Sequence, residues 1–248
     1  MREGVSIREK SGPQDRVTEA DVELSRLIST ELRDRFPGDV IISEEDSHHQ
    51  HASASDRTWL IDPIDGTDNY IRNDGQYAVM IGLIVNLHPV FGWAYGPASG
   101  DSYFGGPGYG AWRKQATGQA ERYQAVATLA AGRPTRLMMG FRDRKSHPWV
   151  NELPQIDWVK SGSVGLKVAK ILNDQADVFA HLSGKLKVWD TAGPVAIALA
   201  AGLEVGQLET DALAFPLPRL EHEGSVIIGR QGSLAWSRAI LLRGTGQQ

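Results

Sequence analysis

The spacing of apolar and polar residues along the chain predicts both helices and strands. A helix is predicted to begin near Thr18 and to end before Pro37-Gly38. Thr18 and Asp21, three residues apart, are typical of a capping box at its start. The side chains expected to bury one face of this helix recur at helical spacing. They are Leu24, Leu27, Ile28 and Leu32.

The pattern differs between the two halves of the chain. The first half has short apolar runs separated by Pro and Gly turns, which predicts an antiparallel sheet with strands at 59–61, 77–85, 90–95 and 101–104. The second half alternates strands at 136–141 and 177–180 with helices at 164–173 and 191–201. We therefore predict two tightly packed subdomains, 1–123 with a helix and an antiparallel sheet, and 124–248 with alternating strands and helices.

Composition narrows the class of protein. The 248 residues carry 26 Lys plus Arg against 30 Asp plus Glu, and 41% are hydrophobic, as in ordinary globular proteins. The net charge of −4 argues against a nucleic acid polymer as partner. Without cysteine the chain has no disulfides, thiolate ligands or thiol nucleophiles, so any metal needs oxygen or imidazole ligands. We expect a cytoplasmic protein, because no apolar run reaches membrane length and the first residues do not resemble a signal peptide.

The acidic turn at 62–67 is the first candidate for chemistry. Asp62 and Asp65 lie on either side of Pro63, which fixes a turn, and Gly66 leaves backbone N–H groups able to approach an anion. Two carboxylates with a nearby hydroxyl at Thr67 are ligands that Mg²⁺ prefers. Taken alone, the Asp-Gly pair is far more typical of an ordinary turn after a strand than of a metal site.

Five segments together carry a resemblance to a known family. In chain order they are Val17–Asp21, Ser43-Glu44-Glu45, Asp62–Thr67, Gly162-Ser163 and Trp189–Ala192. They are similar in sequence and order to the motifs of the inositol monophosphatase superfamily of Mg²⁺-dependent, lithium-sensitive phosphatases, over roughly Lys10 to Gly202. The resemblance implies that family's α/β layered sandwich, with the active site between the two subdomains 1–123 and 124–248. It also implies a reaction in which metal-activated water attacks a phosphomonoester directly.

The resemblance also implies a role for each matching residue. Glu44 would help to orient the attacking water, and Asp21 would accept a hydrogen bond from Thr67 so that Thr67 can take a proton from that water. Gly66, Thr67 and Ser163 would contact the phosphate. Two or three Mg²⁺ ions would be held by Glu44, Asp62, the Ile64 carbonyl, Asp65, Thr67 and Asp190. Clustered carboxylates tolerate one another when cations neutralise them, and two metals can stabilise both oxygens of an in-line displacement.

Each of these residues also has a purely structural interpretation. Asp21 and Asp190 could only cap the helices that follow them, and Glu44-Glu45 could be a solvated acidic pair. Trp189 is expected to pack rather than to stack on substrate. The histidines at 48, 49 and 51 are expected to lie on a loop, because no matching ligand spacing occurs elsewhere.

The residues expected near the substrate point to two different substrate classes. Ser183 stands where inositol monophosphatases usually carry an acidic residue that binds inositol hydroxyls. Lys185 and Lys187 could instead hold a second phosphate, and Lys167 resembles a lysine of the bacterial bisphosphate nucleotidases. The segment Asp68-Asn69-Tyr70 points the other way, toward the inositol enzymes.

We therefore predict a 3′(2′),5′-bisphosphate nucleotidase that converts 3′-phosphoadenosine 5′-phosphate to AMP and phosphate. The alternatives are an inositol-1-monophosphatase, a sugar bisphosphatase and, from another class, a sensor that binds phosphorylated ligands without hydrolysis. Family members usually carry one or two further helices before the segment matched here at 10–21. Because those helices contribute to the outer layer and sometimes to a dimer contact, a homodimer stays open.

Overall fold

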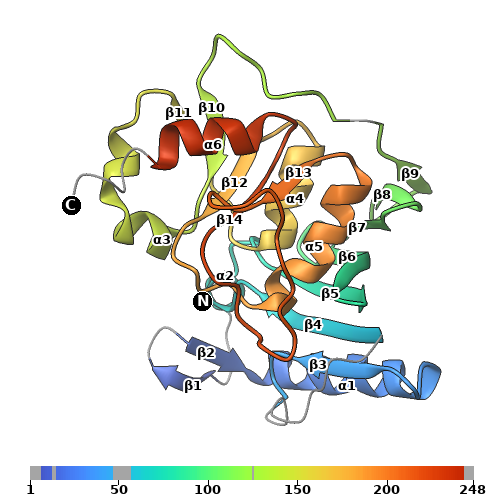
Figure 1. The fold of residues 1–248 in the computed structure, drawn as a ribbon. Coiled ribbons are helices and arrows are strands. Elements are labelled where there is room, and N and C mark those ends of the chain that lie inside the picture. The colour runs from blue at the N-terminus through green and yellow to red at the C-terminus, as the bar shows by residue number, and fades with distance from the viewer. Residues whose placement is uncertain (1–6, 13–14, 47–56, 125, 243–248) are drawn as a thin grey trace.

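A computed structural model describes residues 7–12, 15–46, 57–124 and 126–242. Figure 1 shows two sheets with helices between and outside them. The larger sheet has seven strands in the order β3-β4-β5-β6-β7-β8-β9, with β3 and β4 parallel and every other neighbouring pair antiparallel. Its strands are β3 (Val40–Ser43), β4 (Arg57–Asp65), β5 (Ala78–Val85), β6 (His88–Gly96), β7 (Asp101–Gly106), β8 (Gly110–Lys114) and β9 (Ala120–Arg122).

The smaller sheet has five strands in the order β11-β10-β12-β14-β13. Strand β10 runs parallel to both of its neighbours, whereas β14 is antiparallel to β12 and β13. The strands are β10 (Thr135–Met138), β11 (Ile156–Trp158), β12 (Val178–His181), β13 (Glu204–Gly206) and β14 (Val226–Gly229). A separate hairpin of β1 (Ile7–Gly12) and β2 (Asp15–Thr18) precedes the first helix.

The helices complete a layered sandwich. Helix α1 contacts β3 and β4 on one face of the larger sheet, α4 and α5 lie between the two sheets, and α6 packs on β13 and β14 (Figure 1). The helices are α1 (Glu19–Arg35), α2 (Thr67–Arg72), α3 (Phe141–Ser146), α4 (Val164–Leu172), α5 (Val188–Ala200) and α6 (Ser233–Leu241), with a 3-10 turn η2 (Pro148–Glu152). This arrangement confirms the predicted fold class.

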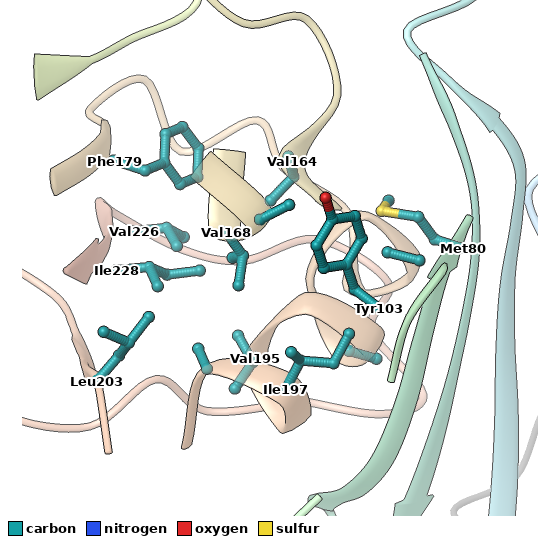
Figure 2. Close-up of a cluster of buried hydrophobic side chains, with 14 of the residues drawn as sticks. Met80, Tyr103, Val164, Val168, Phe179, Val195, Ile197, Leu203, Val226 and Ile228 are labelled. Carbon is teal, nitrogen blue, oxygen red and sulfur yellow. The ribbon is translucent and has the colours of Figure 1, made fainter. Parts of the chain in front are cut away.

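The hydrophobic core joins the two halves of the chain. Figure 2 shows Val168 of α4 and Val195 of α5 between Met80 of the larger sheet and Phe179 and Ile228 of the smaller one. All five side chains are almost completely buried. Sheet membership changes between β9 and β10, near the predicted boundary at 123/124, but the second half supplies the helices that cover the larger sheet.

Helix α1 has the predicted start and a different buried face. Thr18 is its N-cap and forms the capping box with Asp21, as expected. The buried side chains are Asp21, Ser25 and Ser29, whereas Leu27 is 49% exposed and the other three predicted apolar positions are only half-buried. The predicted apolar face is therefore wrong. Small polar residues let the helix approach the sheet, where Ser25 Oγ donates to Ser43 Oγ over 2.7 Å.

Two further boundaries differ from the predictions. Helix α5 begins at Val188 rather than Thr191, which places Asp190 inside its first turn. The strand predicted at 136–141 ends at Met138, and Phe141 begins the short helix α3. None of the helices in the described part of the chain has both the length and the apolar composition that a bilayer crossing requires.

Glycines bring α5 into backbone contact with the larger sheet. A Cβ built on Gly92 of β6 would lie 2.2 Å from the Gly193 carbonyl oxygen of α5, and one on Gly82 of β5 would lie 2.5 Å from the Gly193 nitrogen. Neither distance is possible for a real side chain. Because Asp190 lies one turn before Gly193, this contact also fixes how far Asp190 stands from the strands.

Candidate active site

The end of β4 supplies two of the carboxylates predicted to bind metal. Along β4, every residue from Thr58 to Ile64 is buried, Asp62 among them, because helices α1 and α5 both pack on this strand. The pairing with β5 becomes irregular between Asp62 and Asp65, so the chain turns before Asp65. Gly66 follows with a φ of 91°, a left-handed conformation that glycine adopts readily. Both aspartates line one pocket of about 300 Å³.

Glu44 and Asp190 reach the same pocket from other elements. Glu44 follows β3, and its backbone N–H donates to the Ile61 carbonyl of β4 over 3.0 Å. Asp190 comes from the first turn of α5, where its carboxylate accepts a hydrogen bond from Lys187 N at 2.7 Å. The structure thus brings together residues from both halves of the chain that are up to 146 positions apart in sequence (190 − 44).

These carboxylates raise one another's pKa. Burial is the largest cause of the raised pKa of Asp62, and the charges of Glu44, Asp65 and Asp190 add to it. The pKa of Asp190 is also raised well above its usual value, again by burial first and then by Asp65 and Glu44. A hydrogen bond between the side chains of Asp62 and Asp190 partly offsets this. Such a cluster favours a bound cation or a proton.

The donor set fits magnesium. Asp62 is 1% exposed, and its Oδ1 has no hydrogen-bond partner among the described residues, so a buried anionic oxygen is left for a cation. The Ile64 carbonyl and the Thr67 hydroxyl line the same pocket and add neutral oxygen donors. As the side chains stand, no three His, Asp or Glu residues of the described part of the chain converge on one point. Mg²⁺ usually takes one or two carboxylates and keeps several waters.

Thr67 and Asp21 make the hydrogen bond expected of them. Thr67 Oγ1 lies 3.3 Å from Asp21 Oδ1 and 3.2 Å from the Ile64 carbonyl oxygen. Asp21 Oδ2 also accepts a hydrogen bond from Thr18 N at 2.9 Å, so Asp21 caps α1 and contacts Thr67 at once. Burial raises the pKa of Asp21, and the hydrogen bonds from Thr18 and Thr67 counteract this.

The start of α4 lies next to Asp65 and Gly162. Ser163 is the N-cap of α4, is fully buried, and accepts a hydrogen bond from Leu166 N at 3.3 Å. The Val164 N–H donates to Asp65, so this carboxylate occupies part of the helix N-terminus predicted to bind phosphate. A Cβ on Gly162 would lie 2.1 Å from the Gln76 carbonyl oxygen, which explains the glycine. Gly162 lines a hollow of about 480 Å³ that also includes Asp65, whereas Ser163 is buried.

The three predicted lysines have different surroundings. Lys167 is buried, donates to the Gly162 carbonyl, and has its pKa lowered by burial while Asp65 and Asp190 raise it. Lys185 lines a hollow of about 710 Å³ beside the acidic pocket. Lys187 forms an ion pair with Glu221 outside this hollow.

Helix α3 contributes residues that the sequence patterns did not indicate. Phe141 and Arg142 line the hollow of Lys185, and Arg142 also lines the acidic pocket. Asp143 is buried between them and the small sheet, where it accepts hydrogen bonds from Leu182 N at 2.8 Å and from the Ser183 hydroxyl. The segment Phe-Arg-Asp-Arg-Lys resembles any short exposed helix, so no local signal could have identified it.

The remaining expectations concern neighbours of the site. Trp189 is buried in the core, as a packing residue should be. Glu45 is half-buried beside Glu44. The histidines at 48, 49 and 51 lie outside the described residues.

Comparisons with known proteins identify the family of this chain. The family model described as "Inositol monophosphatase family" matches residues 1–241. The 3′(2′),5′-bisphosphate nucleotidase CysQ of Salmonella typhimurium is 32% identical over 195 residues, covering 76% of this chain and 75% of that protein. The inositol-1-monophosphatase of Mycobacterium bovis is 31% identical over 242 residues, covering 93% and 79%.

Solved structures share the fold. The IMPase of Thermotoga maritima has a TM-score of 0.79 at 21% identity and covers 98% of this chain and 89% of its own. An IMPase/NADP phosphatase described as complexed with Mg²⁺ and phosphate has a TM-score of 0.78 at 19% identity, covering 96% and 86%. The motifs, the fold and the family match agree, and the chain belongs to the inositol monophosphatase family.

Proposed function

We propose that this phosphatase is a Mg²⁺-dependent phosphomonoesterase that acts on 3′(2′),5′-bisphosphate nucleotides, with 3′-phosphoadenosine 5′-phosphate as substrate. The observation that carries the proposal is an acidic pocket that opens beside a basic hollow. The first has Glu44, Asp62, Asp65 and Asp190 on its walls, and the second has Arg72, Arg142, Lys145 and Lys185. Metal ions suit the acidic pocket, and a second phosphate suits the basic hollow.

The metal ligands we propose are Glu44, Asp62, the Ile64 carbonyl, Asp65, Thr67 and Asp190, which all line the acidic pocket. Magnesium bound there would act as a Lewis acid toward the phosphate and lower the pKa of the attacking water. Another structure that shares the fold, of staphylococcal inositol monophosphatase-1, is described as a LiCl-soaked inhibitory complex. This description supports testing lithium as an inhibitor here.

The chain's own residues position the water and take its proton. When Thr67 Oγ1 donates to Asp21 Oδ1, the lone pairs of the threonine oxygen are free to accept a hydrogen bond from the attacking water. As the water attacks, its proton would pass to Thr67 Oγ1 while the threonine proton passes to the Asp21 carboxylate. Glu44 lines the same pocket and would orient that water. The backbone at Gly66, Thr67 and Gly162 would hold the phosphate, with Ser163 supporting the loop from beneath.

The site also has room for a nucleoside. The hollow of about 480 Å³ has Asp65, Gly162 and Phe141 among its lining residues, and Phe141 is 83% exposed. A planar base can stack on such a ring. The CysQ relatives, which are named for bisphosphate nucleotide hydrolysis, support the same substrate class.

An inositol monophosphate is the second candidate. It is favoured by the inositol-1-monophosphatase relative, which matches 93% of this chain. Against it, Ser183 does not offer an acidic group for inositol hydroxyls, and its hydroxyl is engaged by buried Asp143.

Phosphate release with Mg²⁺ tests the proposal on one preparation with 3′-phosphoadenosine 5′-phosphate, inositol 1-phosphate and fructose 1,6-bisphosphate. We expect the nucleotide to have the highest kcat/KM, and Asp62→Asn to remove its hydrolysis. A clear preference for inositol 1-phosphate or the sugar would replace the proposed substrate. Metal-dependent binding of the nucleotide without phosphate release would indicate a sensor instead.

A further inference from the structure

One arginine lies where the acidic pocket and the basic hollow meet. Arg142 lines the acidic pocket, the basic hollow and the hollow of about 480 Å³ proposed to hold the nucleoside. Among the described residues, it is the one basic side chain on the wall of the acidic pocket. Its guanidinium Nη2 donates to Asp68 Oδ2 over 3.3 Å, which links α3 of the second half to α2 of the first.

This ion pair is easily exchanged. The Arg142 side chain is 58% exposed and that of Asp68 37%, and exposed pairs of this kind contribute little to stability. A phosphate group offers a guanidinium two acceptor oxygens and a larger charge than one carboxylate does. An incoming phosphate can therefore replace Asp68 as the partner of Arg142 at small cost.

The other cations near the site either make other contacts or lie away from the acidic pocket. Arg72 pairs with Asp74, and Lys145 lines the basic hollow but not the acidic pocket. Lys167 Nζ donates to the Gly162 carbonyl, and Lys187 pairs with Glu221. Arg144, on the same short helix as Arg142, lies with its guanidinium 3.9 Å from the centre of the Trp158 ring and donates to Asn151. Lys185 lines the basic hollow but not the acidic pocket.

We infer that Arg142 selects substrates with a second phosphate, by leaving Asp68 and binding that phosphate while the first phosphate lies in the acidic pocket. This role of Arg142 rests on the proposed function and would make Arg142 the residue that gives the enzyme its specificity for bisphosphates. Phe141, the neighbour of Arg142 in the chain, presents its exposed ring to the same hollow, so the base and the second phosphate of one nucleotide would meet consecutive residues.

The test compares two substrates that differ in one group, 3′-phosphoadenosine 5′-phosphate and adenosine 3′-monophosphate. In Arg142→Gln we expect the ratio of their kcat/KM values to fall about ten- to a hundredfold, through a higher KM for the bisphosphate. Arg142→Lys should recover part of the ratio, because it keeps the charge but not the planar fork. Arg144→Gln is the matched control and should leave the ratio unchanged.

Product inhibition gives a second readout. 5′-AMP retains the second phosphate, so its inhibition constant should rise by a similar factor in Arg142→Gln. Inorganic phosphate lacks that group, so its inhibition constant should stay the same. Equal loss with both substrates, or equal weakening of both inhibitors, would place Arg142 on the reacting phosphate and overturn the inference.

A double-mutant cycle tests the exchange with Asp68. Asp68→Asn should shift the ratio toward the bisphosphate by a few-fold, since Arg142 is then released from a charged partner, and this gain should vanish in Arg142→Gln. An equal gain in both backgrounds would show that Asp68 does not act through Arg142. If the unaltered protein released no phosphate from bisphosphate nucleotides, the proposed function would fail; if it did and the variant kept the ratio, only the role of Arg142 would fail.

Discussion

Asp62 and Asp177 are both completely buried aspartates, but their neighbours have opposite charges. Asp62 lies among three other carboxylates, and its pKa is raised by burial and then by their repulsion. Burial alone would also raise the pKa of Asp177, but hydrogen bonds from Arg133 and Arg136 outweigh it and hold the pKa well below the usual value.

The arginines surround Asp177 closely. Arg133 Nη1 lies 2.8 Å from one carboxylate oxygen, and Arg136 Nη2 and Arg230 Nε lie 2.8 and 3.0 Å from the other. The chain thus supplies the counter-charge at Asp177, whereas at Asp62 we propose that a metal ion supplies it. On that proposal, equal burial serves stability at one site and function at the other.

The largest expected effect is on activity at the acidic pocket. Asp62→Asn removes a metal ligand and should lower kcat by about a thousandfold or more. The metal-free fold should be as stable as before or more so, because repulsion among the carboxylates is reduced. Phosphate release and thermal unfolding in EDTA measure the two effects. A folded Asp62→Asn protein with near-normal turnover would disprove the assignment.

At the other cluster the effect should be on stability. Asp177→Asn leaves three arginines without their shared partner, one of them almost fully buried, and should cost about 3–5 kcal/mol of unfolding free energy. Urea denaturation measures this, and activity at low temperature should be kept. Asp174→Asn is the matched control: Asp174 pairs with Arg136 and Arg230 but is 79% exposed, so its loss should cost less than about 1 kcal/mol. Equal losses of unfolding free energy in the two variants would show that the burial of Asp177 does not set the cost.

Magnesium should stabilise the folded protein only when the acidic pocket is intact. At a concentration a hundred times its Kd, a ligand that binds only the folded state adds about 2.7 kcal/mol. We expect Mg²⁺ to raise the melting temperature of the unaltered protein and of Asp174→Asn, and to have little effect on Asp62→Asn. An equal rise in all three would indicate a nonspecific salt effect.

The smallest expected effect is a dependence on pH. Because the folded pKa of Asp177 is depressed, its contribution is complete above the unfolded value of about 3.9 and is lost as the pH falls through the folded pKa. The gap in unfolding free energy between the unaltered protein and Asp177→Asn should therefore stay constant from pH 7 to 5 and narrow below about pH 4. A gap that widened in acid would show that packing, not charge, sets the cost.

The residues of the acidic pocket could be predicted because they lie in short motifs that resemble those of a known family. Local sequence alone indicated only a turn at Asp62–Thr67, where Gly66 has a left-handed φ. The hydrogen bond from Thr67 to Asp21 was expected from the resemblance. The buried face of α1 was mispredicted because hydrophobic periodicity assumes apolar docking, whereas Ser25 docks by a hydrogen bond.

Ion pairs between residues far apart in the chain could not be predicted from the sequence. Lys187 pairs with Glu221, 34 residues away, so its availability for phosphate could not be judged from its neighbours. Arg142 becomes significant only when α3 comes to lie beside α2. The arginines of Asp177 likewise come from three separate segments.

The backbone contact between Gly92 and Gly193 sets a minimum distance between α5 and the larger sheet, and so a minimum width of the active site. Backbone already touches backbone there, so any substitution can only add atoms and move α5 outward. Asp190 would travel with the helix, away from Asp62 of β4, which lies two strands from β6 in the sheet. The spacing of these two proposed metal ligands therefore has a lower limit set by main-chain contact, and substitutions at these glycines could widen the site but not narrow it.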